Sequence, residues 1–346
     1  MNKIKIGIIG CGKQAGKHIS CLKKLPGLET VLSDINPDLA KNLAEKTGCS
    51  WVKHPNEIFA DKSIQAVVIC TPTQTHVNLI ELAIDAGKDV LCEKPLCETV
   101  EEAEYLQKSV ARSNRIVLVG YVYRYVPVFE EGFKIFREQA VDGGSLVMGR
   151  PLSAFFRLGG RGGHQVWKHM KSSGGGAINE MLVHMVDLAN WYFGPLKAIE
   201  VISCELRLPE RIIDGNRVVV DAEDYVLLRC VGKDGVKILC QADLITPAFL
   251  QYVEIQTDKG TFVGSIQPDM PSYVFLNQES GGFAAGKTEL NYGRRNVFDI
   301  QMLNFVHSIL KRDTPDRNTV ADSLKLVKCM IEIRRQADLQ REGLNT

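Results

Sequence analysis

The segment that decides the fold reads Lys3-Ile4-Lys5-Ile6-Gly7-Ile8-Ile9-Gly10-Cys11-Gly12-Lys13-Gln14-Ala15-Gly16. An apolar, β-branched run enters a Gly-x-Gly-x-x-Ala turn, and a polar, helix-compatible stretch follows. In this pattern the first glycine permits a tight turn, the second lets the backbone approach a pyrophosphate, and the small third residue lets helix and strand pack closely. Free N–H groups at the helix start favour phosphate binding. We therefore predict cofactor contacts from Gly10, Gly12, Lys13, Gln14 and Ala15.

An acidic residue follows at the distance that a dinucleotide site requires. Asp34 ends the strand-like run 28–33 and stands 18 residues after Gly16. A carboxylate there hydrogen-bonds the adenosine ribose and repels a 2′-phosphate. The next residues, Ile-Asn-Pro at 35–37, supply no Arg or Lys to offset this repulsion, so we expect NAD in preference to NADP. A second role for Asp34, as a helix cap before Pro37, is compatible with the first.

Composition excludes several classes of protein. The length of 346 residues predicts two domains, because single cores rarely grow beyond about 250–300 residues. A formal net charge of +1 gives no field that would recruit nucleic acid or an anionic membrane. No apolar run approaches the roughly 18 residues of a membrane-spanning helix, and no signal-peptide pattern is present. The 10 cysteines lack the close pairs of zinc sites or disulfide frameworks, which favours a cytoplasmic protein without a bound metal.

Strand and helix patterns alternate through the first third of the chain. We expect strands at 3–9, 28–33, 64–70, 88–92 and 116–120, and helices near 13–25, 37–47, 75–86 and 99–112. This alternation predicts an α/β dinucleotide-binding domain of residues 1–121, with a doubly wound parallel sheet.

From residue 122 onward the strand-like segments are longer. They lie at 145–157, 197–207, 222–232, 235–245, 251–257 and 260–266. Residues 232–235, Gly-Lys-Asp-Gly, predict a hairpin turn. We expect an α+β domain of residues 122–346 with a largely antiparallel sheet. Two amphipathic helices near 297–311 and 320–337 close the chain and can pack back on the first domain.

Two strand ends carry polar residues where open α/β sheets bind ligands. The strand 64–70 ends at Thr71-Pro72-Thr73-Gln74-Thr75-His76, whose hydroxyls either cap the next helix or touch the nicotinamide ribose. The strand 88–92 ends at Glu93-Lys94-Pro95. A lysine that follows a core strand is not expected to be an ordinary solvated surface residue, which favours a functional role. Further cofactor contacts are predicted for Thr71, Pro72, Thr73, His76, Glu93 and Lys94.

A glycine-rich loop at 174–176 precedes a third candidate region. Glu180, His184 and Asp187 are spaced i, i+4 and i+7, so a regular helix places them on one stripe. One alternative is that His184 is an ordinary core histidine, as a lone histidine on a helix commonly is. Another is that Glu180, His184 and Asp187 bind a metal ion, although no other residues in the sequence have the spacing of further metal ligands. Three titratable groups after a glycine-rich loop favour a catalytic site.

Together these elements resemble the Gfo/Idh/MocA family of NAD(P)-dependent sugar and polyol dehydrogenases, inositol dehydrogenases included, over nearly the whole chain. The resemblance rests on Gly10, Gly12, Ala15, His18, Asp34, Thr71, Pro72, His76, Glu93-Lys94-Pro95, Tyr123-Arg124-Tyr125, the glycine loop, His184, Asp187 and the closing helices. It implies a Rossmann domain followed by an α+β domain whose open, mainly antiparallel sheet forms a homodimer or homotetramer interface. It also implies hydride transfer between nicotinamide and a secondary alcohol of a sugar, polyol or derivative. An NAD-dependent glycosidase and a non-catalytic nucleotide-sensing regulator are the alternatives within this fold.

The resemblance also assigns roles. In the family the lysine of Glu-Lys-Pro lies between nicotinamide and the reacting carbon, and here that residue is Lys94. The family's Asp-x-x-x-His pair falls on Glu180 and His184, with Glu in place of Asp and Leu182 in place of a common Gly. We hypothesise that His184 is the acid/base, oriented by Glu180 or Asp187. The catalytic candidates are therefore Lys94, His184 and Glu180, and we expect the lysine and histidine to converge on one oxygen.

Substrate contacts are expected in or near the glycine-rich loops of the second domain. The candidates are Arg124, Arg157, His164, Trp167, Lys168, His169, Glu180 and Asp187. Trp167 suits stacking on a pyranose face. The basic residues Arg157, Arg161, Lys168 and Lys171 suggest an anionic substrate feature, such as a uronate or a nucleotide-sugar phosphate, and a solvated loop is the alternative.

Overall fold

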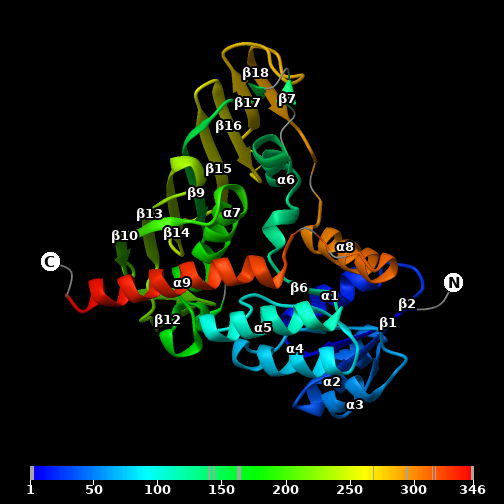
Figure 1. Cartoon of the computed structure of the whole chain (residues 1–346). Helices are drawn as coiled ribbons and strands as arrows, with labels where there is room; N and C mark the ends of the chain where they lie inside the picture. The colour runs from blue at the N-terminus through cyan, green and yellow to red at the C-terminus, as the bar shows by residue number, and fades with distance from the viewer. Residues whose placement is uncertain are drawn as a thin grey trace. The chain divides into compact units, whose positions relative to one another are not determined.

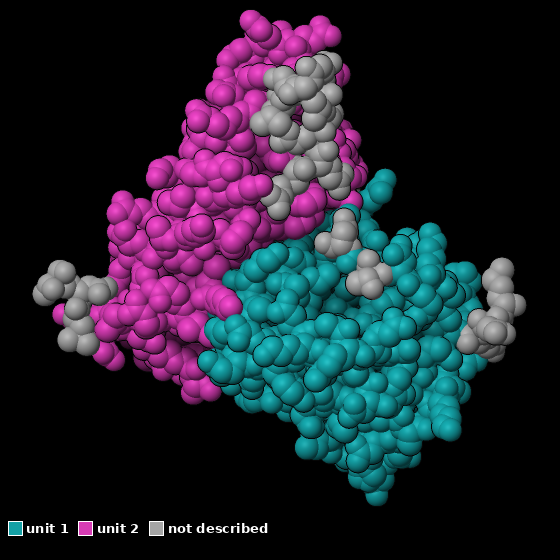
Figure 2. All heavy atoms as spheres, in the orientation of Figure 1, with its two compact units in different colours: residues 1–125, 295–327 teal, residues 126–294, 328–346 magenta. Residues whose placement is uncertain are grey.

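The computed structural model describes residues 4–138, 141–142, 145–161, 165–267, 269–293, 295–313, 315 and 317–343. The chain divides into two compact units (Figure 2). Unit 1 comprises residues 1–125 and 295–327, and unit 2 comprises residues 126–294 and 328–346. Each unit has its own large sheet.

Over the described residues, unit 1 is built on a six-stranded parallel sheet in the order β3-β2-β1-β4-β5-β6. Its strands are β1 (Ile4–Ile9), β2 (Leu28–Ser33), β3 (Ser50–Trp51), β4 (Ala66–Ile69), β5 (Asp89–Cys92) and β6 (Val117–Val119). Its connecting helices are α1 (Lys13–Leu22), α2 (Pro37–Thr47), α3 (Pro55–Ala60), α4 (His76–Asp85) and α5 (Val100–Ser113). This strand order is that of a doubly wound dinucleotide-binding sheet, so the predicted Rossmann fold is confirmed.

Local sequence explains most element boundaries in unit 1. β4 and β5 are fully buried, as expected for central strands with helices on both faces. α2 begins after Asn36, whose side chain accepts a hydrogen bond from the Asp38 N–H, and ends at Gly48 in the left-handed conformation. A capping box formed by Thr99 and Glu102 starts α5. β3 and α3 were not predicted, because two and six residues are too few to show a period.

The closing helix α8 (Val297–Lys311) belongs to unit 1. Its Met302, Phe305 and Val306 join the hydrophobic core that includes α1 and β1. The last helix, α9 (Val320–Arg341), begins in unit 1 and continues in unit 2. Among the helices that the structure describes, none combines the length and the apolar character that crossing a membrane requires.

Unit 2 contains a mixed sheet of eight strands in its described part, in the order β10-β13-β14-β9-β15-β16-β17-β18. The strands are β9 (Pro151–Gly159), β10 (Lys197–Glu205), β13 (Tyr225–Val231), β14 (Lys237–Asp243), β15 (Leu250–Thr257), β16 (Gly260–Ser265), β17 (Ser272–Leu276) and β18 (Gly286–Leu290). The β9–β14 pair is parallel and the other neighbours are antiparallel. The predicted, mainly antiparallel sheet is therefore confirmed.

The two faces of this sheet differ. Along β9, Phe156 and its alternate neighbours are buried, whereas Phe155 and Arg157 between them are partly exposed. Phe156 contacts Tyr192 of α7 (Val183–Phe193) edge to face, with 5.9 Å between ring centroids. Helix α7 lies over one face of this sheet (Figure 1). Because side chains alternate along a strand, Arg157 lies on the face opposite that of Phe156.

Several strands of unit 2 differ from the prediction. The strand expected at 145–157 is divided into β8 (Ser145–Leu146) and β9, with Gly149 at φ +76 between them. β17, β18, the short β7 (Val141–Asp142) and the β11 (Glu210–Ile213)–β12 (Asn216–Val219) hairpin were not predicted. Residues 232–235 connect β13 to β14 as the predicted hairpin turn.

Candidate active site

The turn after β1 has the shape that a pyrophosphate needs. Gly10 has φ +92, and a Cβ there would lie 2.8 Å from the Cys70 carbonyl, so glycine is required. A Cβ at Gly12 would meet no heavy atom of the described residues within 4 Å, which leaves room beside the backbone. Over the residues described, α1 starts at Lys13 with no side-chain cap and no acidic residue in its first turn. Its N–H groups can therefore receive an anion, and these residues fit a nicotinamide dinucleotide.

Three further turn residues were predicted to contact the cofactor. Lys13 is exposed and Gln14 is half-buried, with no hydrogen-bond partner for Gln14 Oε1 in the described part of the chain. Ala15 is fully buried where α1 packs on the sheet. Ala15 therefore supports the turn through close packing, and Lys13 and Gln14 stay candidates for ligand contact.

Asp34 is held in a defined orientation at the end of β2. Its Oδ2 accepts a hydrogen bond from the Cys11 N–H at 2.7 Å, and its Oδ1 accepts one from the Asn36 N–H at 2.9 Å. Both donors are backbone groups, so the carboxylate ties the phosphate turn to the next loop. The neighbouring Ile35 is 95% exposed. The helix-cap role considered for Asp34 is wrong, because Asn36 caps α2.

His76 connects the two strand-end turns of unit 1. Its Nε2 lies 2.9 Å from the Thr71 carbonyl oxygen and its Nδ1 lies 2.9 Å from the Pro95 carbonyl oxygen. The side chain is buried, unlike Thr71, Pro72 and Thr73, which keep exposed surface at the carboxyl end of β4. His76 therefore positions these turns, and its predicted contact with the cofactor stays a prediction.

Glu93 is also turned inward. Its Oε1 lies 2.7 Å from His18 Nε2, and the two side chains are 9% and 1% exposed. Burial alone would raise the pKa of the Glu93 carboxyl, but the hydrogen bond with His18 and the charge of Lys94 outweigh it and hold the pKa below its usual value. Glu93 thus anchors the turn that carries the half-buried Lys94, and its predicted cofactor contact stays a prediction.

In unit 2 the glycine loop is fixed by a carboxylate distant in sequence. Glu223 Oε1 accepts a hydrogen bond from the Ile178 N–H at 3.2 Å, and Glu223 Oε2 pairs with the Arg341 guanidinium. Gly176 has φ +109, and a Cβ there would lie 2.3 Å from Glu223 Oε1. The loop therefore depends on glycine both for its backbone conformation and for the close approach of Glu223.

The helix after this loop begins with a π turn, Ile178–Leu182, before α7. The prediction assumed a regular α-helix, and the wider turn changes the angular spacing of Glu180 relative to His184. Both of these side chains are half-buried, whereas Asp187 is 1% exposed. Among the described residues, no group of three or more His, Cys, Asp or Glu side chains is arranged to hold a metal ion.

Glu180 forms an ion pair with Lys168. Lys168 Nζ lies 2.9 Å from Glu180 Oε2, with 26% and 12% of the side-chain surfaces exposed. The same ammonium lies 5.6 Å from the ring centroid of Trp167, which is 44% exposed. These three predicted substrate residues therefore meet on one surface of unit 2.

Two other predicted substrate residues, Arg124 and Arg157, contact carboxylates. Arg124 is 1% exposed and pairs with Asp322 at 3.1 Å, so it is a structural residue of unit 1. Arg157 lies on the sheet face opposite α7, where its guanidinium is 3.7 Å from Asp243. The sequence pattern did not reveal these carboxylate partners, and the substrate contacts of Arg124 and Arg157 stay predictions.

The two remaining histidine candidates are His169 and His164. His169 is buried, and burial together with the charge of Arg211 lowers its pKa to about 4, so it is neutral at physiological pH. His164 lies outside the described residues. Sequence reasoning, in turn, missed the supporting pair of Glu223 and Arg341, whose 118-residue separation leaves no local signal.

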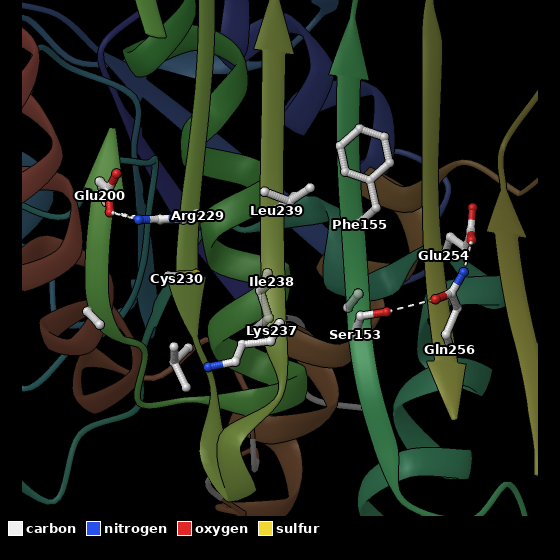
Figure 3. A pocket seen from close by; sticks show the side chains of 13 residues that line it. Ser153, Phe155, Glu200, Arg229, Cys230, Lys237, Ile238, Leu239, Glu254 and Gln256 are labelled. Atoms are coloured by element: carbon white, nitrogen blue, oxygen red, sulfur yellow. Dashed lines mark hydrogen bonds and ion pairs between the residues drawn. The ribbon is translucent and has the colours of Figure 1, made fainter. Parts of the chain in front are cut away.

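A shallow hollow of about 600 Å³ lies on the face of the unit 2 sheet that is turned away from α7. Phe155 and Leu239 stand between two polar pairs, Glu200–Arg229 and Ser153–Gln256 (Figure 3). The residues that line the hollow include the charged Lys237 and Glu254, and none of the predicted site residues is among them.

Two family models match the chain. Residues 4–121 match the Gfo/Idh/MocA model described as an oxidoreductase family with an NAD-binding Rossmann fold, and residues 139–263 match the Gfo/Idh/MocA C-terminal domain. Together these matches span more than two thirds of the chain.

Individual relatives agree with this assignment. An inositol 2-dehydrogenase of Burkholderia ambifaria is 28% identical over 299 residues, which cover 78% of this chain and 85% of the relative. A levoglucosan dehydrogenase of Pseudarthrobacter phenanthrenivorans is 26% identical over 256 residues, which cover 66% of this chain and 64%, less than two thirds, of that enzyme. The crystal structure of an oxidoreductase domain protein from Kribbella flavida has the same fold, with a TM-score of 0.84, 20% identity and 98% coverage of both chains.

Proposed function

Because the chain belongs to the Gfo/Idh/MocA family of NAD(P)-dependent oxidoreductases, we propose that it is an NAD-dependent dehydrogenase of a cyclic polyol, sugar or sugar derivative. The single observation that supports this most strongly is the phosphate turn, where an uncapped α1 and an open Gly12 adjoin the fixed carboxylate of Asp34. The named activities of the inositol and levoglucosan relatives support a ring alcohol as the substrate.

In this proposal NAD supplies the hydride acceptor, and two side chains act on the alcohol oxygen. Lys94 donates a hydrogen bond to that oxygen and stabilises the negative charge that develops on it. His184 accepts the proton, a task that suits imidazole near neutral pH. Since Glu180 pairs with Lys168, we assign the orientation of His184 to Asp187, three residues later on the same helix.

We base the expected preference for NAD over NADP on the carboxylate of Asp34, which directly follows β2. Asp34 is fixed by two backbone N–H groups, so its charge cannot easily move away from a 2′-phosphate. The next residue, Ile35, is exposed and uncharged. No basic side chain stands at positions 35–37 to bind such a phosphate.

The test is a substrate panel of inositols, aldoses, uronates and nucleotide sugars. With each compound, the formation of NADH is measured by its absorbance. We expect NAD reduction with at least one uncharged ring alcohol, and a lower kcat/KM with NADP. Absence of NADH formation with every member, or release of a leaving group without net NADH, would contradict the dehydrogenase and, in the second case, favour a glycosidase.

We further propose self-association through the outer face of the unit 2 sheet. This face combines the exposed apolar side chains of Leu239 and Phe275 with the ion pair of Glu200 and Arg229. Apolar side chains gathered on an otherwise charged face are typical of subunit contacts. Light scattering of the wild type and of Leu239→Glu tests this, since the variant should shift a dimer or tetramer toward the monomer.

A further inference from the structure

The last helix of the chain contacts the segment that leads into the helix of His184. Residues 328–341 of α9 belong to unit 2, as does the glycine loop at 174–176. Arg334 Nε donates a hydrogen bond to Asn179 Oδ1 at 3.0 Å, although 155 residues separate the two in sequence. Asn179 lies in the π turn between the loop and α7. A side chain near the C-terminus therefore reaches the candidate active site.

The Asn179 side chain contacts both α9 and the glycine loop. Its Nδ2 donates a hydrogen bond to the Gly174 carbonyl at 3.1 Å and a longer one to the Gly175 carbonyl at 3.5 Å, while its oxygen accepts from Arg334. An asparagine amide carries two donor hydrogens and an acceptor oxygen, so it can serve both sides at once. An aspartate would lack the donors, and the two carbonyl oxygens would repel it. Asparagine is thus suited to join these carbonyls to a cation.

The part of α9 that bears Arg334 is itself fixed to the sheet of unit 2. Gln336 Nε2 donates to the Ile199 carbonyl at 2.8 Å, and Gln336 Oε1 accepts the Val201 N–H at 2.8 Å. Both partners are backbone groups of β10. Ile333, next to Arg334, is fully buried, and Arg334 itself is half-buried. The guanidinium is therefore presented to Asn179 from a fixed backbone.

A second arginine of the same helix supports the same segment. Arg341 pairs with Glu223, whose Oε1 accepts the Ile178 N–H at 3.2 Å. Because an α-helix has 3.6 residues per turn, positions 334 and 341 lie on one face of α9, two turns apart. This face therefore supports two consecutive residues at the start of the π turn, one through its backbone and one through its side chain.

The position of this turn matters for the proposed chemistry. His184 is the second residue of α7 and stands five residues after Asn179 in continuous helical structure. A shift of the π turn would carry the imidazole with it. Proton transfer requires the reacting heavy atoms to lie about 2.6–3.2 Å apart. A displacement of about 1 Å, even from a change far from the chemistry, can cost about a hundredfold in rate.

We propose that Arg334, acting through Asn179, is a positioning residue for the acid/base His184. The contact holds the π turn in place, so that the imidazole keeps its orientation toward the alcohol oxygen. Neither Arg334 nor Asn179 touches the substrate in this role. The inference rests on the proposed function, because it takes His184 as the proton acceptor. It extends the candidate active site to the C-terminal helix of the chain.

The first experiment removes the guanidinium and then supplies it in solution. With the best substrate of the panel, Arg334→Ala should lower kcat at least about tenfold and leave KM within about threefold, since orientation is lost and substrate contacts remain. Millimolar guanidinium chloride should restore part of this kcat. Arg334→Lys keeps a donor and should give an intermediate kcat. The matched control is Arg335→Ala, an exposed arginine of the same helix that pairs with Glu332, and it should behave as wild type with or without guanidinium.

The second experiment asks whether the two residues act through one contact. Asn179→Ala removes the link to Arg334 and to the loop carbonyls together. The double variant of Asn179→Ala with Arg334→Ala should therefore have a kcat no lower than about half that of Asn179→Ala alone, because coupled residues are not additive. Fully multiplicative losses would show that the two side chains act independently and would overturn the proposal.

Amide hydrogen exchange of residues 174–182 gives a readout that does not depend on activity. Exchange should be at least about tenfold faster in Arg334→Ala than in wild type and unchanged in Arg335→Ala, with circular dichroism confirming that each variant is folded. Unchanged exchange in Arg334→Ala would overturn the link, whatever the activity. Faster exchange with an unchanged kcat, or no response to guanidinium, would overturn the positioning role. If the wild type oxidises no compound, the dehydrogenase and the role of His184 fail together, and the exchange rates still decide whether α9 holds the turn.

Discussion

Glu93 in unit 1 and Glu180 in unit 2 each contact a basic side chain, but they do so in opposite environments. The pair of Glu93 and His18 is 9% and 1% exposed, whereas Glu180 and Lys168 keep 12% and 26% of their surfaces exposed. The buried pair ties helix α1 to the turn that carries Lys94. The more open pair adjoins the exposed indole of Trp167.

The difference shows how one kind of interaction serves two purposes. A buried ion pair has already given up its hydration, and removing one partner leaves an uncompensated polar group, so such a pair fixes structure. A partly exposed pair contributes less to stability, but it can exchange water for ligand hydroxyls. We therefore expect variants of the first region to affect the arrangement of the site and variants of the second to affect ligand choice.

The largest expected effect concerns the residue that the buried pair supports. Lys94→Met should lower kcat by about a thousandfold, in line with the loss of a preorganised charge stabiliser. Binding of NADH, followed by fluorescence titration, should remain within about twofold. Lys62→Met, at an exposed position, is the matched control and should behave as wild type. A turnover number of Lys94→Met within a few-fold of wild type would refute the assignment.

The second test addresses the catalytic group of the other region. His184→Asn should lower kcat by about a hundredfold, because general acid–base catalysis typically contributes about 10²–10⁴. The dependence of kcat/KM on pH that a general base causes should also disappear. His307→Asn, on the exposed side of α8, serves as the control. A variant that keeps the wild-type pH profile would exclude His184 as the base.

The glycine loop offers a test of structure alone. Gly176→Ala combines a φ of +109 with a contact of 2.3 Å to Glu223, so we expect a loss of about 3 kcal/mol or more in unfolding free energy. Gly174→Ala has a φ of +72, and its Cβ would meet no described atom within 4 Å, so it should cost only about 1 kcal/mol. Urea denaturation measures both, and equal losses would show that the Glu223 contact is unimportant.

Cofactor preference should respond to two positions at the end of β2. Asp34→Asn combined with Ile35→Arg removes the repulsive charge and adds a guanidinium at an exposed position. We expect the ratio of kcat/KM for NADP over NAD to rise about tenfold or more, since arginine binds phosphate oxygens strongly. Ile35→Gln is the uncharged control. No change in the ratio would place the adenosine ribose away from Asp34.

The last test concerns the pH dependence of the buried pair. The pKa of Glu93 is lower in the folded protein than in the unfolded chain, so its stabilisation is present above the unfolded pKa of about 4.3 and is lost as pH falls toward the folded value. Glu93→Gln should lower the Tm at pH 7, with a cost of about 1–3 kcal/mol. The difference from wild type should shrink below about pH 5, whereas the exposed Glu101→Gln should show no such trend. A constant difference across pH would mean that the Glu93 charge is not what stabilises the turn.

Much of the candidate site in unit 1 could be predicted because its residues follow strand ends directly. Gly10 and Asp34 directly follow strands of a parallel sheet and Lys94 stands two residues after one, and the carboxyl ends of such strands meet at one edge. The side-chain orientations of His76 and Glu93 could not be predicted from their positions after the strands. Both side chains face inward and contact residues on other segments, Pro95 and His18.

The sequence by itself determined the Rossmann domain, the mainly antiparallel sheet and the positions of the dinucleotide turn, because residue periodicity and glycine spacing record local backbone conformation. Only the tertiary structure decided which charges neutralise one another. Lys168 pairs with Glu180, Arg157 with Asp243 and Glu223 with Arg341. Such pairs depend on how strands align and how helices pack, and a one-dimensional pattern carries no record of the element that will lie opposite a given side chain.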